Sequence, residues 1–149
     1  KLYKKSFNVN VEIARFYNVY GPNEPLDEKF GNVIGIWREK VRLNKPLTIV
    51  GDGNQKRDFT HVDDIVDGII KIAFSNKKHS DAWELGSGVS YSIKELFNMF
   101  KERFNATSIY VDDQPGNYRK TLRINDDVLK QLDWKPKDRL KDYVKSLNL

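Results

Sequence analysis

Apolar and polar residues alternate along the chain with two different periods, and these periods predict helices and strands. Apolar residues three or four positions apart indicate a helix, as with Ile65, Ile69 and Ile72. Short runs of β-branched and aromatic residues indicate strands, as in 47–50. We expect helices at 2–7, 32–43, 63–75, 93–104, 126–132 and 140–147, and strands at 10–17, 47–50, 58–61, 81–85, 108–111 and 120–124. Because the two kinds of element alternate, the pattern favours an α/β fold.

Residues that begin and end helices support these assignments. Ser92 is expected to cap the helix at 93–104, with Glu95 three residues later as its capping-box partner. Asp63 or Asp64 is expected to cap the helix at 63–75. Residues 18–30 are rich in Pro, Gly and Asn and are predicted to form a loop.

The segment from Gly51 to Asp64 carries the most information. The strand at 47–50 ends in Gly-Asp-Gly-Asn, which tolerates positive φ angles, and Arg57 follows among polar residues. A fixed guanidinium in such a corner can hold a phosphate by a two-pronged contact. A β-turn with a solvated arginine explains the same residues, and the segment alone does not decide between the two.

Composition narrows the class of protein. The chain has 149 residues, 39% hydrophobic and 32% charged, which fits one ordinary domain without an apolar run long enough to span a membrane. It has no cysteine, and its two histidines are isolated, so no metal-ligand spacing is present. The formal net charge is +5, but the lysines are scattered, which favours a solvated surface over binding of nucleic acid.

Some large or titratable side chains are expected to be structural. Trp37, Trp83 and Trp134 are predicted to lie in the core rather than to serve as ligand platforms. His61 is expected to pack internally, and Asp63 is expected to cap its helix rather than take part in chemistry.

Three segments together resemble a known family. Residues 11–22 read VEIARFYNVYGP, 47–69 read LTIVGDGNQKRDFTHVDDIVDGI, and 113–136 read DQPGNYRKTLRINDDVLKQLDWKP. In this order and at about this spacing they resemble the signatures of the nucleotide-sugar epimerases and dehydratases, the extended short-chain dehydrogenases that include UDP-glucose 4-epimerase. The resemblance covers essentially the whole chain.

The resemblance implies the C-terminal part of a longer enzyme. The Gly-rich dinucleotide fingerprint of the family has no counterpart here, and its catalytic Tyr-x-x-x-Lys pair is expected before residue 1, so no catalytic residue is assigned. Residues 1–30 would be a remnant of the Rossmann domain, with its last strand or strands. Residues 31–149 would mainly form the small α/β domain that binds the sugar nucleotide.

The resemblance also implies roles for residues near strand ends. Tyr17 would lie near the nicotinamide and the sugar, and Asn18 would bind the diphosphate region. Asn32 would begin a helix whose N-terminus favours phosphate, although a plain N-cap accounts for it as well. Arg57 would bind phosphate.

The nucleotide would be bound by further positions. Thr48 and Val50 match the strand that lines the base, through backbone groups. Gln114 and Asn117 stand where the family frequently has the Arg and Asp of Arg-Pro-Gly-Asp, so charge is missing from this part of the substrate site. Arg119 is close enough in sequence to compensate.

The activity implied is that of an NAD-dependent nucleotide-sugar 4-epimerase, with a UDP-sugar as substrate. A 4,6-dehydratase or 4-reductase is the alternative within enzymes, and a free-standing module that binds sugar nucleotides is the alternative outside them. The expected cofactor is NAD, and the expected location is the cytoplasm, with a possible homodimer in the full-length protein. The 149 residues alone are expected to be inactive.

Overall fold

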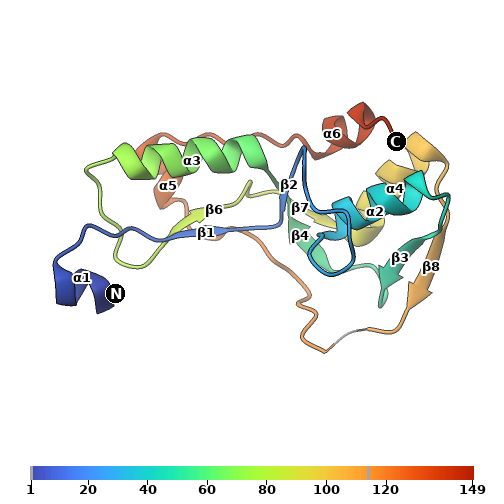
Figure 1. The fold of residues 1–149 in the computed structure, drawn as a ribbon, viewed down its shortest axis with the longest axis horizontal. Coiled ribbons are helices and arrows are strands. Elements are labelled where there is room, and N and C mark those ends of the chain that lie inside the picture. The colour runs from blue at the N-terminus through green and yellow to red at the C-terminus, as the bar shows by residue number, and fades with distance from the viewer. Residues whose placement is uncertain (1, 114) are drawn as a thin grey trace.

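The chain forms an elongated body with two lobes joined by short strands (Figure 1), described by a computed structural model for residues 2–113 and 115–149. The β1 lobe contains α1 (Leu2–Phe7), β1 (Ala14–Phe16), α3 (Val62–Phe74), β6 (Trp83–Leu85) and α5 (Asp127–Leu132). The β3 lobe contains α2 (Val33–Arg42), β3 (Leu47–Val50), α4 (Ile93–Phe104), β8 (Ser108–Val111) and α6 (Leu140–Ser146). Between the lobes lie β2 (Val19–Tyr20), β4 (Lys56–Asp58), β5 (Thr60–His61) and β7 (Ser90–Ser92).

The described strands associate in pairs. β1 pairs with β6, β2 with β5, and β3 with β8, all in parallel, whereas β4 and β7 run antiparallel. Parallel strands must be joined by a crossover connection. Along the chain, α3 precedes β6, the partner of β1, and α4 precedes β8, the partner of β3, so helices form part of these connections. The α/β class expected from the alternating pattern is therefore confirmed.

Each lobe has its own core. In the β3 lobe, the fully buried Trp37 meets Phe100 edge-on, with ring centroids 5.5 Å apart, and packs beside Ile49. In the β1 lobe, Trp83 and Trp134 pack with a group of aliphatic residues. This group comprises Ile65, Ile72, Leu85 and Val128. The expectation that the three tryptophans are core residues is confirmed.

The helix assignments agree with the structure to within two residues at each end. Ser92 caps α4, and its hydroxyl and backbone exchange hydrogen bonds with Glu95 in a complete capping box, as predicted.

The structure corrects the predicted N-cap of α3. The N-cap is His61, whose Nδ1 accepts from the Asp63 N–H, and neither Asp63 nor Asp64 occupies the capping position. β5 runs directly into the helix, so the helix begins at Val62. The two aspartates therefore fall in the first turn, where their charge favours the positive end of the helix dipole. His61 is also buried and meets Tyr20 edge-on, which confirms its packing role.

The strand assignments need more correction. Only residues 14–16 of the predicted strand 10–17 pair with a neighbour, and the predicted strand 58–61 divides at Phe59 into β4 and β5. Residues 120–124 form no strand and contribute only an isolated bridge between Lys56 and Lys120. β2 lies in the predicted loop 18–30, and β7 was not predicted. The division into residues 1–30 and 31–149 stays a prediction.

Across the described residues, no helix is both long enough and apolar enough to cross a bilayer.

Candidate functional site

A cavity of about 240 Å³ lies where the β3 lobe meets the central strands, at the free edge of β3 and the start of α2. The residues that line it are Asn18, Asn32, Val33, Thr48, Val50, Gln55, Arg57, Ile93 and Asn117. This set contains every substrate-binding residue predicted from the sequence except Gln114, which lies outside the described residues. Residues spread over a hundred positions of sequence thus meet around one space.

The edge of β3 presents backbone groups to this cavity. The N–H group of Leu47 donates to the Thr107 carbonyl, and the N–H group of Gly51 donates to the Val111 carbonyl, both on the side of β8. Because successive N–H groups of a strand alternate in direction, those of Thr48 and Val50 point to the opposite edge. The carbonyls on that edge are already used: the Trp37 indole donates to the Thr48 carbonyl at 3.1 Å, and Gln55 donates to the Val50 carbonyl at 2.8 Å. A flat heterocycle with hydrogen-bond acceptors could meet the remaining N–H groups.

Gln55 was not predicted as a site residue. Its side chain is buried and holds the turn after β3 by its bond to the Val50 carbonyl. A glutamine two residues before Arg57 carries no distinctive sequence signal, because only the fold places its amide against the strand edge.

Arg57 extends from β4, and neutral oxygens fix its guanidinium. Nη1 donates to the carbonyls of Tyr118 at 2.6 Å and Lys56 at 2.9 Å, and Nη2 donates to Asn117 Oδ1 at 2.6 Å. Burial lowers the pKa of Arg57. The fixed guanidinium anticipated from the sequence is present, and a half-buried cation of this kind attracts an anion.

Asn18 and Asn32 shape the other wall. Asn18 Nδ2 donates to the Asp58 carbonyl at 3.3 Å and to Thr121 Oγ1 at 3.1 Å, so this side chain ties β4 to the 121 segment. Asn32 Oδ1 accepts from the N–H groups of Ile34 and Gly35, as an N-cap does, and Val33 at the first helical position also lines the cavity. The first turn of α2 has no acidic residue that would repel an anion.

Comparison with known proteins shows the family. Residues 1–86 match the model of the NAD dependent epimerase/dehydratase family. The chain belongs to this family. Over 143 residues it is 30% identical to UDP-glucuronic acid decarboxylase 1 of Arabidopsis thaliana, a match that covers 94% of this chain and 32% of that protein.

Solved structures of epimerases have the same fold. UDP-glucuronic acid 4-epimerase from Bacillus cereus, in complex with UDP-glucuronic acid and NAD, superposes with a TM-score of 0.86 at 27% identity. UDP-glucose 4-epimerase from Thermotoga maritima, with UDP-glucose, also superposes with a TM-score of 0.86, at 25% identity. Each match covers 97% of this chain and 46% of the solved chain, so this chain spans about half the length of these epimerases. The fold expected for this epimerase/dehydratase family is therefore confirmed.

Tyr17, the predicted cofactor neighbour in this family, directly precedes Asn18 but is not among the residues that line the cavity. It follows the end of β1, and burial, together with a hydrogen bond to Glu84 and the charge of that residue, raises the pKa of Tyr17 to about 12. Its ring lies against Gly86, where an added Cβ would come within 2.8 Å of the ring and within 2.7 Å of the Asp58 carboxylate. The phenol is therefore protonated at neutral pH, and its contact with a cofactor stays a prediction.

Asp58, beside Arg57, joins the segments around the site. It is completely buried, and its carboxylate accepts from the N–H groups of Ser87, Gly88 and Arg123 and from the hydroxyls of Ser87 and Thr60. These donors come from the turn after β6, from β5 and from the 121–123 segment. Asp58 thus sets the position from which Arg57 enters the cavity, a role that sequence reasoning missed because its donors are remote in sequence.

Arg119, the possible compensating charge, is otherwise engaged. Its guanidinium forms an ion pair with Asp52 at 3.0 Å on the surface, and it does not line the cavity.

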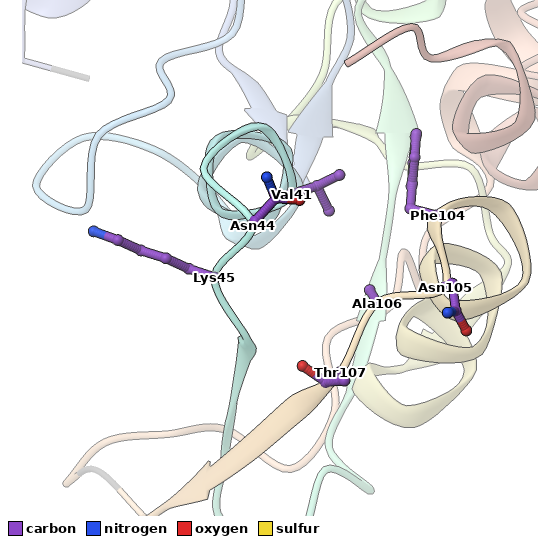
Figure 2. Close-up of a pocket in the computed structure, with 7 residues that line it drawn as sticks. All are labelled: Val41, Asn44, Lys45, Phe104, Asn105, Ala106 and Thr107. Atoms are coloured by element: carbon purple, nitrogen blue, oxygen red, sulfur yellow. The ribbon is translucent and has the colours of Figure 1, made fainter.

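A second cavity, of about 230 Å³, lies at the C-terminal ends of α2 and α4 (Figure 2). Lys45 is the only charged residue among those that line it, and its side chain extends away from the others. The remaining lining residues are Val41, Asn44, Phe104, Asn105, Ala106 and Thr107. The first cavity, by contrast, is lined by Arg57 and by most of the residues expected to bind the substrate, so it is the better candidate site.

Proposed function

We propose that this chain is the sugar-nucleotide-binding part of an NAD-dependent nucleotide-sugar 4-epimerase that acts on a UDP-sugar. One observation carries the proposal: Asn18, Asn32, Thr48, Val50, Arg57 and Asn117 line a single cavity. The resemblance of the sequence implies nucleotide contacts for the same residues.

The geometry suggests how a nucleoside diphosphate would fit. The outward N–H groups of Thr48 and Val50 would meet the base, whose carbonyl oxygens accept hydrogen bonds. Arg57 and the N-terminus of α2 would attract the diphosphate, because both place positive charge beside the cavity. The volume of about 240 Å³ lies just below the usual range for small-molecule sites, which suits a site that is completed by further protein or by ligand closure.

NAD would accept the hydride from a sugar carbon and return it. The 149 residues offer little to hold this cofactor: the Gly-rich fingerprint is not among them, and Tyr17 is the one residue assigned beside it. Tyr17, placed after β1 and held by Glu84, would form part of the wall beside the nicotinamide. We expect the 149-residue chain to bind NAD weakly and to show no turnover.

Calorimetric titration of the chain with UDP, dTDP and GDP tests the binding site. The proposal predicts saturable binding of UDP, tighter than binding of GDP, because a cavity of about 240 Å³ suits the smaller base better. Arg57→Gln should weaken UDP binding by about tenfold or more, since a charge-assisted contact is lost. Failure of the unaltered chain to bind any of the three would contradict the proposal.

A decarboxylase acting on UDP-glucuronic acid is the second candidate, favoured by the 30% identity to the Arabidopsis thaliana decarboxylase. The natural polypeptide from its source, assayed with UDP-glucose and UDP-glucuronic acid, separates the possibilities. Appearance of the 4-epimer alone supports the epimerase, release of carbon dioxide supports the decarboxylase, and loss of water supports a dehydratase. Binding without any turnover would support a free-standing binding module.

A further inference from the structure

β8 is an edge strand with an uncovered outer side. It pairs in parallel with β3 along one edge, and none of the described strands pairs with its other edge. Figure 1 shows β8 at the periphery of the β3 lobe. Three consecutive large apolar side chains of this strand are exposed: Ile109 by 48%, Tyr110 by 58% and Val111 by 38%. The strand contains no proline or lysine, and its register with β3 has no bulge, so it lacks the usual devices that protect an edge.

The register with β3 shows which backbone groups of β8 face outward. The carbonyls of Thr107 and Val111 accept hydrogen bonds from the side of β3. Because backbone groups alternate in direction along a strand, the N–H and carbonyl groups of Ser108 and Tyr110 point to the open edge. Asp112, the next position in this alternation, follows directly after the strand. Outward groups of this kind are a template for a further strand.

A second copy of β8 fits this edge. A strand that pairs with its own copy about a twofold axis is antiparallel, and Tyr110 is the outward-facing residue at the centre of the exposed run. With Tyr110 on the axis, Ile109 lies opposite Val111 of the other copy, which joins two exposed apolar side chains. Ser108 lies opposite Asp112 of the other copy, which sets a hydroxyl donor against a carboxylate. The two Asp112 carboxylates stay about 13 Å apart, because they lie at opposite ends of the ribbon.

The other edge of the same sheet is not equivalent. Along the outer edge of β3, the Trp37 indole donates to the Thr48 carbonyl and the Gln55 amide donates to the Val50 carbonyl. The candidate cavity lies at that edge too. A further strand at β3 would displace these side chains, whereas a further strand at β8 leaves them and the cavity in place.

We propose that β8 is a self-association surface, through which two copies of this chain join their sheets edge to edge, in antiparallel register centred on Tyr110. The joined sheet runs β3, β8, β8, β3. A contact of one strand pair is small, so the dimer is weak rather than obligate, with a dissociation constant below about 1 mM. The inference does not depend on what the cavity binds, because the two surfaces lie on opposite edges of the sheet.

Sedimentation equilibrium over a range of chain concentrations tests the surface. The unaltered chain should show a monomer–dimer equilibrium. Tyr110→Pro removes an N–H that faces outward, so the pairing of β8 with β3 should persist while dimerisation is lost. Phe30→Ala removes an exposed aromatic side chain outside β8 and should leave the equilibrium unchanged. Thermal unfolding of Tyr110→Pro checks that the fold is retained.

A second pair of variants tests the register without proline. Ile109→Lys and Val111→Glu should each dimerise several-fold more weakly than the unaltered chain, because each sets charged side chains against apolar ones. When the two variants are mixed, the introduced lysine lies opposite the introduced glutamate in the mixed dimer, and the remaining Val111 lies opposite the remaining Ile109. The mixed dimer should therefore be tighter than the dimer of either variant alone.

Each claim has a result that overturns it. An unaltered chain that stays monomeric up to about 1 mM would overturn the self-association surface, as would a dimer that Tyr110→Pro leaves intact. If mixing Ile109→Lys with Val111→Glu brought no gain, the register centred on Tyr110 would be wrong. Binding of UDP by Tyr110→Pro should equal that of the unaltered chain, so failure of the dimer and failure of the proposed function are observed separately.

Discussion

The two lobes differ in how completely they cover their own apolar surface. The β3 lobe buries Trp37 and Phe100 completely, and its exposed large apolar residues lie mainly on β8. The β1 lobe leaves many more exposed. They are Leu2, Tyr3, Phe7, Val9, Val11, Ile13, Phe16, Val66, Ile69, Ile70 and Phe74. The candidate cavity lies on the lobe that closes its own core.

The larger exposed apolar surface of the β1 lobe follows in part from how its strands pair. β1 pairs with β6 alone among the described strands, so its other edge is open, and parallel strands in α/β proteins are ordinarily covered on both faces. α3 likewise carries apolar residues on the side turned away from the core, with Phe74 87% exposed. The comparison shows that the β1 lobe carries more apolar surface than the described residues cover.

The largest expected effect contrasts a buried aromatic residue of the β3 lobe with an exposed one of the β1 lobe. Trp37→Ala should lower the free energy of unfolding by about 3–5 kcal/mol, because it empties the centre of a packed core. Phe74→Ala removes an aromatic ring of the β1 lobe that is already exposed to water. It should change the free energy of unfolding by less than about 0.5 kcal/mol. Urea unfolding of both variants measures the difference. Equal losses would contradict the exposure of Phe74.

The second prediction concerns the junction between the lobes. Asp58→Asn should cost about 2–3 kcal/mol, because a buried acceptor of several hydrogen bonds loses its charge and half of its acceptor capacity. Asp52→Asn, at the surface pair with Arg119, is the matched control and should have little effect. Thermal unfolding measures the midpoints of the two variants. A similar midpoint for both would contradict the joining role of Asp58.

The third prediction concerns binding alone. Arg57→Lys keeps the charge but loses the planar fork and its hydrogen bonds to Tyr118 and Asn117, so UDP affinity should fall roughly tenfold with at most a small fall of the unfolding midpoint. Calorimetry and thermal unfolding of one preparation give both numbers. A large loss of stability with unchanged affinity would make Arg57 a structural residue.

The smallest effect is expected at the capping box of α4. Ser92→Ala should cost about 1 kcal/mol. Hydrogen bonds from Ser92 hold the pKa of Glu95 below its usual value. A lowered carboxyl pKa gives stability that is complete above the unfolded-state value of about 4.3 and is lost as pH falls through the folded-state value. Unfolding measured from pH 7 to pH 3 should therefore show the gap between Ser92→Ala and the parent protein narrowing in acid.

The sequence predicted the helices better than the strands. Helix ends carry local signals, such as Ser92 with Glu95, and these survive without tertiary context. Strands depend on partners: Val19–Tyr20 became β2 only because Thr60–His61 lies beside it. The cap at His61 was missed because the geometry of β5 decides where α3 begins.

Six of the residues that line the cavity, Asn18, Asn32, Thr48, Val50, Arg57 and Asn117, were named through resemblance, but their connections were not. Nothing local in the sequence reveals that Asp58 gathers N–H groups from Ser87 and Arg123, or that Asp113 orients the amide of Asn117. Such contacts join positions that only the complete fold brings together.

The central claim is that the cavity of the β3 lobe binds a nucleoside diphosphate, and its most direct test is a map of amide chemical shifts during titration with UDP. The account predicts saturable shifts at Val33, Thr48, Val50 and Asn117, which line the cavity. The amide of Phe74, in the β1 lobe, should not move. Shifts confined to the apolar face of the β1 lobe, or no saturable shifts at all, would contradict it.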